Sequence, residues 1–323
     1  MLFIILEHVS IFLLEPPIKK ITNMKTIEIS SFEQFEIEYR DFFVKNKKKI
    51  QKNYQIVDIK KIQQCASTKK CFIFVSETTF VFAFPIFDFL ELILFYTDEN
   101  KFENDLSFIK EYVKKNQPHV NKLKVSLCDN SGFESVRIND ILLANGFCVS
   151  KKIARFKNSA TRNNKSNLDS DYMLTLVPEH LRQAEFAKKE DAKEILECML
   201  KEFDPIGDAI PELDEIEDNI EKGQVVIVRD YSVTPPLGKI VSFTYFNIIN
   251  SIYYGLFDYS DRNYRQYFVF YAVQYFMDHI KRDKKLSRSY GWRDVNNKRT
   301  TRYALNKKDE ADGVVVCNLI CEL

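Results

Sequence analysis

Glycine is scarce in this sequence. Only 8 of the 323 residues are glycine, and no two of them lie close together. Loops that cradle phosphate need several glycines in a short stretch, because the backbone amides must approach the anion closely. The sequence therefore excludes a P-loop and a dinucleotide-binding fingerprint. It also contains no G-x-S-x-G nucleophile motif and no H-E-x-x-H metalloprotease motif.

Histidine and paired cysteine are equally scarce. The 4 histidines are scattered, and none of the 7 cysteines belongs to a C-x-x-C pair. The sequence therefore predicts no zinc or other metal site. Most of the cysteines lie in apolar runs, where a buried free thiol is the usual state. Unpaired cysteines are typical of a reducing compartment, so we expect a cytoplasmic protein.

The chain also lacks a charge bias and a long apolar run. Lys and Arg number 47 against 46 Asp and Glu, which gives a net charge of +1 and disfavours a protein that mainly coats nucleic acid. The apolar stretch 1–14 is short and contains Glu7 and His8, so we predict no membrane span. Residues 1–23 are expected to be an N-terminal extension, with Met24 as an alternative start. The sequence carries no signal for an oligomeric state.

A polar segment divides the remainder of the chain. Residues 158–171 are rich in Asn and Ser and poor in large apolar side chains, which predicts a linker. The linker separates an N-terminal domain, 24–157, from a C-terminal domain, 172–323, and both have an ordinary domain size.

Hydrophobic periodicity predicts the same order of elements in both domains: strand, helix, strands, helix, strand, helix, strand. In the C-terminal domain the longest predicted helix covers 265–281 and is followed by a strand at 287–293. The shared order favours an internal duplication. The predicted fold class is α+β, with two tandem domains that each have a mixed, mostly antiparallel sheet flanked by helices.

The segment Trp292–Tyr303 carries the clearest motif. It reads W-R-D-V-N-N-K-R-T-T-R-Y, and Asn296 is followed seven residues later by Tyr303. This pattern resembles a strand–turn–helix of the GNAT acyltransferase superfamily. The preceding segment 253–270 resembles the cofactor-binding element of that superfamily, and 142–147 in the N-terminal half is similar to the end of the same fold.

The resemblance implies an enzyme with two GNAT-like domains in tandem. Its expected cofactor is acetyl-CoA or another acyl-CoA, and its expected reaction is direct transfer of the acyl group, acetyl above all, to the amine of a small molecule or peptide. Tyr303 would be the acid that protonates the departing thiolate, and Asp258 the candidate base. The resemblance implies cofactor contacts at Phe257, Tyr259, Tyr264, Arg265, Gln266, Tyr267, Phe268, Val269 and Asn296.

Two departures from the family pattern qualify these expectations. The family has small residues or glycines where this chain has Gln266, Phe268 and Phe270, and bulky side chains restrict how closely the backbone approaches a pyrophosphate. In the N-terminal half the corresponding loop, 97–103, is acidic, and Leu142 stands near the place of the tyrosine. The N-terminal domain is therefore expected to be non-catalytic.

Two other functions fit the same residues. A tandem aminoacyltransferase that takes its amino acid from charged tRNA would explain the poor phosphate loop and the basic run Lys281–Lys308. A non-catalytic binding or regulatory protein could have kept the fold and lost the cofactor. The acidic stretch Glu212–Glu221 fits either the selection of an amine acceptor or a solvated helix.

Overall fold

The computed structural model describes residues 23–47, 59–129, 137–159, 167–233, 238–286, 288–298, 300–302 and 309–323. The first part of the chain forms β1 (Lys25–Ile29), α1 (Phe32–Asn46), α2 (Ile59–Thr68), β2 (Cys71–Val75), β3 (Thr79–Ile86), β4 (Phe89–Tyr96), α3 (Glu99–Asn116), β5 (Lys122–Asp129), α4 (Arg137–Ala144) and β6 (Cys148–Ser159).

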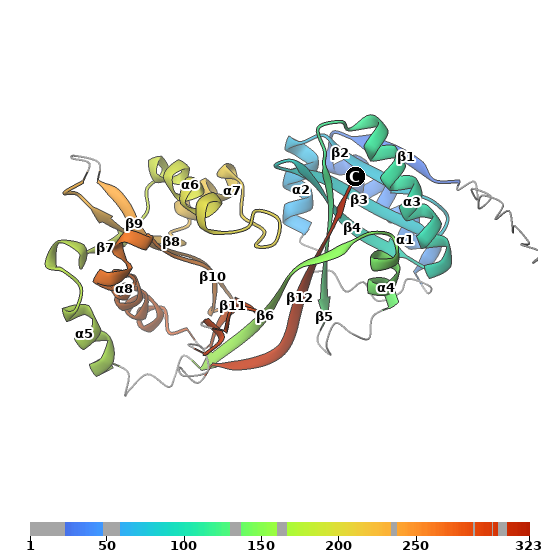
Figure 1. Cartoon of the computed structure of the whole chain (residues 1–323). Helices are drawn as coiled ribbons and strands as arrows, with labels where there is room; N and C mark the ends of the chain where they lie inside the picture. The colour runs from blue at the N-terminus through green and yellow to red at the C-terminus, as the bar shows by residue number, and fades with distance from the viewer. Residues whose placement is uncertain are drawn as a thin grey trace, which may run out of the picture.

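The second part follows the same plan (Figure 1). Its elements are α5 (Asn167–Thr175), η3 (Glu179–Leu181), β7 (Ala184–Phe186), η4 (Lys189–Asp191), α6 (Ala192–Glu202), α7 (Leu213–Glu221), β8 (Val225–Asp230), β9 (Lys239–Ile249), β10 (Ile252–Ser260), η5 (Arg262–Tyr267), α8 (Phe270–Asp283), β11 (Arg288–Asp294) and β12 (Glu310–Glu322). The helix predicted at 265–281 begins at Phe270, and a 3₁₀ turn precedes it.

Within the described residues, the strands form one twelve-stranded sheet in the order β1-β2-β3-β4-β5-β12-β6-β11-β10-β9-β8-β7. The pairs β4–β5 and β10–β11 are parallel, and the other pairs are antiparallel. Helices cover both faces of the sheet. The predicted fold class, an α+β chain with a mixed and mostly antiparallel sheet, is confirmed.

The last strand of each half joins the sheet of the other half. Strand β6 pairs with β11, while β12, from the end of the chain, lies between β5 and β6. Figure 1 shows β6 and β12 running side by side between the two lobes. The two halves therefore share one continuous sheet. Of the predicted linker 158–171, Ser159 ends β6, Asn167 begins α5, and 160–166 lie outside the described residues.

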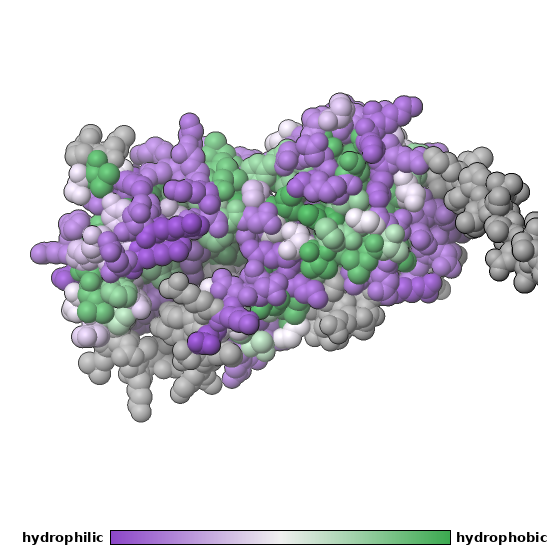
Figure 2. Space-filling model, viewed as in Figure 1, coloured by the Kyte–Doolittle hydropathy of each residue, from purple (hydrophilic) through white to green (hydrophobic). Residues whose placement is uncertain are grey.

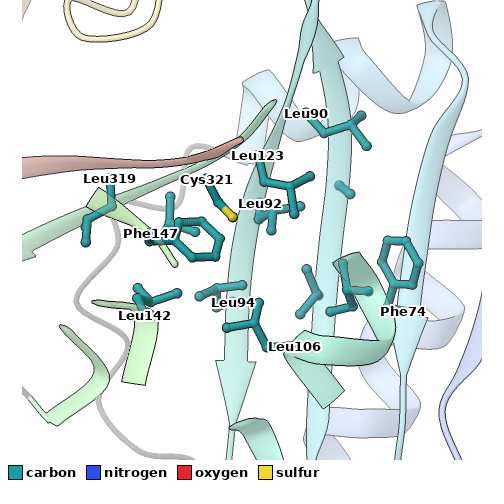
Figure 3. Packing of buried hydrophobic residues seen from close by; sticks show 14 of the residues in the cluster. Phe74, Leu90, Leu92, Leu94, Leu106, Leu123, Leu142, Phe147, Leu319 and Cys321 are labelled. Carbon is teal, nitrogen blue, oxygen red and sulfur yellow. The ribbon is translucent and has the colours of Figure 1, made fainter. Parts of the chain in front are cut away.

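Each half buries apolar side chains on both faces of its part of the sheet. In the first half, one apolar cluster lies beneath α3 and α4 and includes Leu92, Leu106, Leu142 and Cys321 (Figure 3). The apolar residues of α3 recur at helical spacing, so that one face of the helix packs on this cluster. In the second half one cluster lies under α8 and another under α6 and α7. On the face seen in Figure 2, hydrophilic residues prevail and hydrophobic ones form small patches.

No helix within the described ranges is long and apolar enough to cross a bilayer. Within the same ranges, no three His, Cys, Asp or Glu side chains are grouped so that they could hold a metal ion.

Candidate active site

A pair of glycines marks the point where β10 and β11 part. The two strands run parallel only as far as Gly255, which faces Gly291. Immediately after Gly255, the register of β10 against β9 shifts before Phe257, which is the sign of a β-bulge. A Cβ added at Gly291 would meet no atom within 4 Å. The parallel strands thus open into a wedge lined at its apex by backbone.

The wedge lies within a cleft of about 2100 Å³. One side of the cleft is built by the segment from α6 to α7, and the other by α8 and the end of β11. The first half of the chain also contributes, through Lys61 and Gln64 of α2 and Lys151 of β6. One site therefore contains Gly255 and Gly291, which lie far apart in the sequence. It also contains residues from the half that was expected to be non-catalytic.

The hydrogen-bonding direction of β10 shows which backbone groups face the wedge. The Asp261 amide donates to the Val241 carbonyl over 2.9 Å, so Asp261 points its backbone groups toward β9. Because the direction alternates along an antiparallel strand, Phe257 and Tyr259 also point theirs toward β9. Asp258 and Ser260 direct their N–H and C=O groups to the opposite edge, where β11 has moved away.

Asp258 lies in the cleft, on the same face of β10 as Tyr253. Its carboxylate accepts a hydrogen bond of 2.7 Å from the Thr244 hydroxyl. Surrounding protein raises the pKa of Asp258 because it disfavours the charged form, while the Thr244 bond and the charges of Arg293 and Lys281 lower it in part. The side chain nevertheless keeps accessible surface toward the cleft. A carboxylate with a raised pKa and access to a ligand is suited to accept a proton.

The turn before α8 differs from a phosphate-cradling loop. Phe268 adopts a left-handed conformation with φ 54°, at the position where the family pattern has a small residue. A bulky side chain in that region costs about 1–2 kcal/mol. The Phe268 side chain is 48% exposed, and Val269 beneath it is buried. Phe268 thus supplies the backbone conformation that glycine would give, but its ring stays at the surface of the turn.

The basic side chains of this turn are already paired. Glu202, the last residue of α6, accepts from Arg262 Nε over 2.8 Å and from Arg265 over 3.3 Å. The Tyr264 hydroxyl donates to Asp230 over 2.8 Å, and desolvation together with this bond raises the pKa of Tyr264 to about 12. Two carboxylates, Glu202 and Asp230, therefore hold this turn.

The predicted contact residues divide into two groups. Among the residues that the structure describes, those that line the cleft are Phe257, Asp258, Tyr259 and Arg265. Those that do not line it are Tyr264, Gln266, Tyr267, Phe268, Val269 and Asn296. The Asn296 amide donates to Asp294 over 2.8 Å in the turn after β11. Tyr303, the predicted acid, lies outside the described residues.

Charges of both signs line the cleft. The carboxylates are Glu202, Asp204, Asp208, Glu215, Asp218, Asp258, Asp278, Asp294 and Asp309. The basic side chains are Lys61, Lys151, Lys222, Arg265, Lys281 and Arg293. Over the described part of the lining, acids thus outnumber bases by nine to six.

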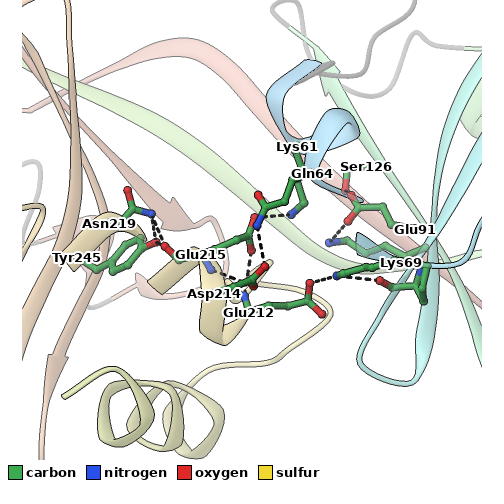
Figure 4. A network of polar contacts seen from close by, with 12 residues as sticks. Lys61, Gln64, Lys69, Glu91, Ser126, Glu212, Asp214, Glu215, Asn219 and Tyr245 are labelled. Carbon is green, nitrogen blue, oxygen red and sulfur yellow. Dashed lines mark hydrogen bonds and ion pairs between the residues drawn. The ribbon is translucent and has the colours of Figure 1, made fainter. Parts of the chain in front are cut away.

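A polar network ties the α6–α7 side of the cleft to the first half of the chain (Figure 4). From α2, Gln64 donates to Asp214 over 2.8 Å and Lys61 lies 3.7 Å from Glu215, and Lys69, just after α2, pairs with Glu212. The exchanged strands add further bonds: Asn318 of β12 donates to the Gly207 carbonyl over 2.6 Å, and Lys151 of β6 donates to Asp208 over 2.5 Å. The first half, together with β12, thus fixes α7 and the segment that precedes it.

The corresponding wedge of the first half is filled. Strands β4 and β5 part after Leu92 and Val125, which are fully buried and stand where the second half has its two glycines. Phe147 and Cys321 pack into the same cluster (Figure 3). We predicted a loop at 97–103, but α3 already begins at Glu99 within this segment, and Asp98 caps its first amides. Among the described residues of the first half, the apolar packing and the cap leave no comparable site.

Solved structures share this architecture, although no protein-family model and no curated protein matches the sequence. A tandem GNAT protein from the clavulanic acid biosynthesis pathway aligns over 93% of this chain and 98% of its own, with a TM-score of 0.54 and 8% identity. A GCN5-related N-acetyltransferase from Sphaerobacter thermophilus aligns over 82% and 86%, with a TM-score of 0.53 and 7% identity.

A third similar structure is a GCN5-related glucosamine N-acetyltransferase region of a fungal multi-domain GH3 β-N-acetylglucosaminidase. It gives a TM-score of 0.63 at 8% identity, over 93% of this chain and 38% of that one. The chain has the GNAT fold in its tandem form, which confirms the resemblance found in the sequence.

Proposed function

We propose that this protein is an acyl-CoA-dependent N-acyltransferase and that it transfers an acyl group, with acetyl the expected one, to an amine in the cleft of its second half. The observation that carries the proposal is the wedge at Gly255 and Gly291. It combines open space, a bulge and outward-facing backbone groups at the place where the GNAT fold parts its parallel strands. A narrow, uncharged arm such as pantetheine fits a wedge of this kind.

Bound acyl-CoA supplies an activated thioester, and the residues of the chain would position its acyl group and deprotonate the attacking amine. The N–H groups of Asp258 and Ser260 face the wedge and are the donors available to hold the acyl oxygen. The Asp258 carboxylate would take the proton of the attacking amine, and its raised pKa favours that role. Tyr303 remains the proposed acid for the leaving thiolate.

The acceptor would enter from the side of α6 and α7, where the cleft is lined by Asp204, Asp208 and Glu215. Carboxylates there favour a small-molecule or peptide amine over an anionic acceptor. The first half of the chain, 24–157, is proposed to be non-catalytic and to hold α7 in place, because its own wedge is filled by Leu92 and Val125. All seven cysteines are free, which supports a reducing, cytoplasmic location.

Binding of acetyl-CoA to the full chain tests the proposal. Ligand at 100 times its dissociation constant should stabilise the protein by about 2.7 kcal/mol, which thermal unfolding detects. Tyr303→Phe should then lower turnover with little loss of binding. Absence of any acetyl-CoA binding would refute the proposal. In that case, tRNA binding that weakens steeply with salt would favour the aminoacyltransferase, and no binding of either ligand would favour a non-catalytic protein.

A further inference from the structure

We propose, on the basis of the proposed function, that the donor is recognised by its pantetheine thioester arm and hardly at all by its nucleotide end. Glu202 is the residue that sets this specificity. The inference comes from contacts at the turn between β10 and α8, which is where the GNAT fold would meet the phosphates of coenzyme A.

Glu202 competes with phosphate for the arginines of this turn. Its two oxygens contact Arg262 at 2.8 and 3.4 Å and Arg265 at 3.3 Å. Arg262 and Arg265 are the basic residues of the stretch 260–270. The Glu202 side chain is 12% exposed, whereas those of Arg262 and Arg265 are 71% and 49% exposed. A nearly buried carboxylate therefore holds two arginines that would otherwise be available to an anion.

The backbone of the turn is also partly committed. The Asp261 side chain accepts from the Asn263 amide over 2.9 Å, and its other oxygen accepts from Lys239 over 2.6 Å. The Phe268 amide donates to the Arg265 carbonyl over 3.2 Å. Phe268 then presents an exposed ring where a small residue would let a pyrophosphate approach. The amides of Asn263 and Phe268 are therefore committed, and the Phe268 ring leaves less room for a phosphate than a small residue would.

The charge of the cleft acts in the same direction. Its described lining has nine carboxylates and six basic side chains, so a ligand with several negative charges gains little there. The nucleotide end of coenzyme A carries a pyrophosphate and a third phosphate, but the pantetheine arm is uncharged. The wedge at Gly255 and Gly291 offers backbone groups and open space, which suit the arm.

The first experiment compares two donors on the full-length protein by calorimetry. Acetyl-CoA and S-acetyl-pantetheine should bind with dissociation constants within about tenfold of each other, because the nucleotide adds little. Acetyl-CoA binding that is 100-fold tighter or more would overturn the inference and leave the proposed function intact. If neither donor binds, the proposed function fails and the inference falls with it.

The second experiment uses Glu202→Gln, which keeps the size of the side chain and removes its charge. The variant should bind acetyl-CoA about tenfold more tightly and S-acetyl-pantetheine as before, since only the former carries phosphates near the released arginines. Glu197→Gln, on the exposed side of the same helix, is the matched control and should change neither constant. Unchanged or weaker acetyl-CoA binding by Glu202→Gln would overturn the role of Glu202.

Discussion

Substitution of Gly291 by residues of increasing size should change donor affinity without lowering the stability of the fold. The position lies in β11 with no left-handed torsion, and no atom stands within 4 Å of an added Cβ. The folded protein therefore does not require glycine there. If the wedge holds the donor arm, each added methyl group enters the space that the arm uses.

The expected magnitudes have opposite signs. Gly291→Ala should stabilise the protein by about 0.4–1 kcal/mol, because it restricts the unfolded chain and creates no clash. Gly291→Val and Gly291→Leu should keep that stability. Forcing extra methyl groups into an occupied space costs about 1–3 kcal/mol, so donor affinity should fall by about 5-fold to 150-fold as the side chain grows.

Urea unfolding and calorimetric titration with acetyl-CoA measure the two effects on the same samples. Gly255→Ala is an informative contrast, since its Cβ would lie 3.2 Å from a ring carbon of Tyr253 and should destabilise the fold itself. Arg288→Val, on the same strand and outside the cleft lining, should leave affinity unchanged. Undiminished affinity in Gly291→Leu would refute the assignment of the wedge to the donor.

Three further predictions concern buried charge, proton transfer and the exchanged strands. Glu91→Ala should lower the free energy of unfolding in urea by about 3–5 kcal/mol, because the ammonium of Lys124, which is 1% exposed and 3.6 Å from Glu91, would lose its partner. Lys124→Met should be neutral or stabilising by about 1–4 kcal/mol. A stable Glu91→Ala variant and an unstable Lys124→Met variant would contradict this. Burial lowers the pKa of Lys124, so wild-type stability should rise as pH increases from that lowered value toward 10.5, and Lys124→Met should lose the slope. The pKa of Asp258 is raised on folding, so stability should fall as pH rises from the unfolded-state pKa to the folded-state pKa, while turnover rises over the same range. Asp258→Asn should abolish both trends. Unaltered pH profiles in this variant would exclude Asp258 as the base. Residues 172–323 expressed alone should not form a stable monomer, because β11 loses β6 and β12 loses β5, and cooperative unfolding of a monomeric fragment would show otherwise.

Local periodicity was sufficient to predict the fold class. The amphipathic helices and alternating strands of each half are encoded in short windows, and the repeated order indicated a tandem fold. The exchange of β6 and β12 could not be read in the same way. Both are long strands that end their halves, and either could complete either part of the sheet. The choice depends on pairing between residues far apart in the sequence, such as Ile153 with Val316.

The site was predictable only where it rests on contiguous residues. The segment around Asp258 was found because a motif carries it, and Asp258 does line the cleft. Gly255 and Gly291 look isolated in the sequence and become a pair only when parallel strands align. Glu202 reaches Arg262 from a different helix, a contact for which the sequence carries no signal. The end of the pairing between β10 and β11 at Gly255 and the left-handed backbone of Phe268 likewise depend on tertiary structure and could not be predicted from local sequence.

A crystal structure of the full chain with bound acetyl-CoA or coenzyme A tests the central claim most directly. The account predicts the pantetheine arm in the wedge beside Gly255 and Gly291, with backbone groups of Asp258 or Ser260 at hydrogen-bond distance from it. It also predicts the nucleotide end outside the turn that Glu202 holds. Density for the ligand in the first half of the chain, or with its arm away from the two glycines, would contradict the account.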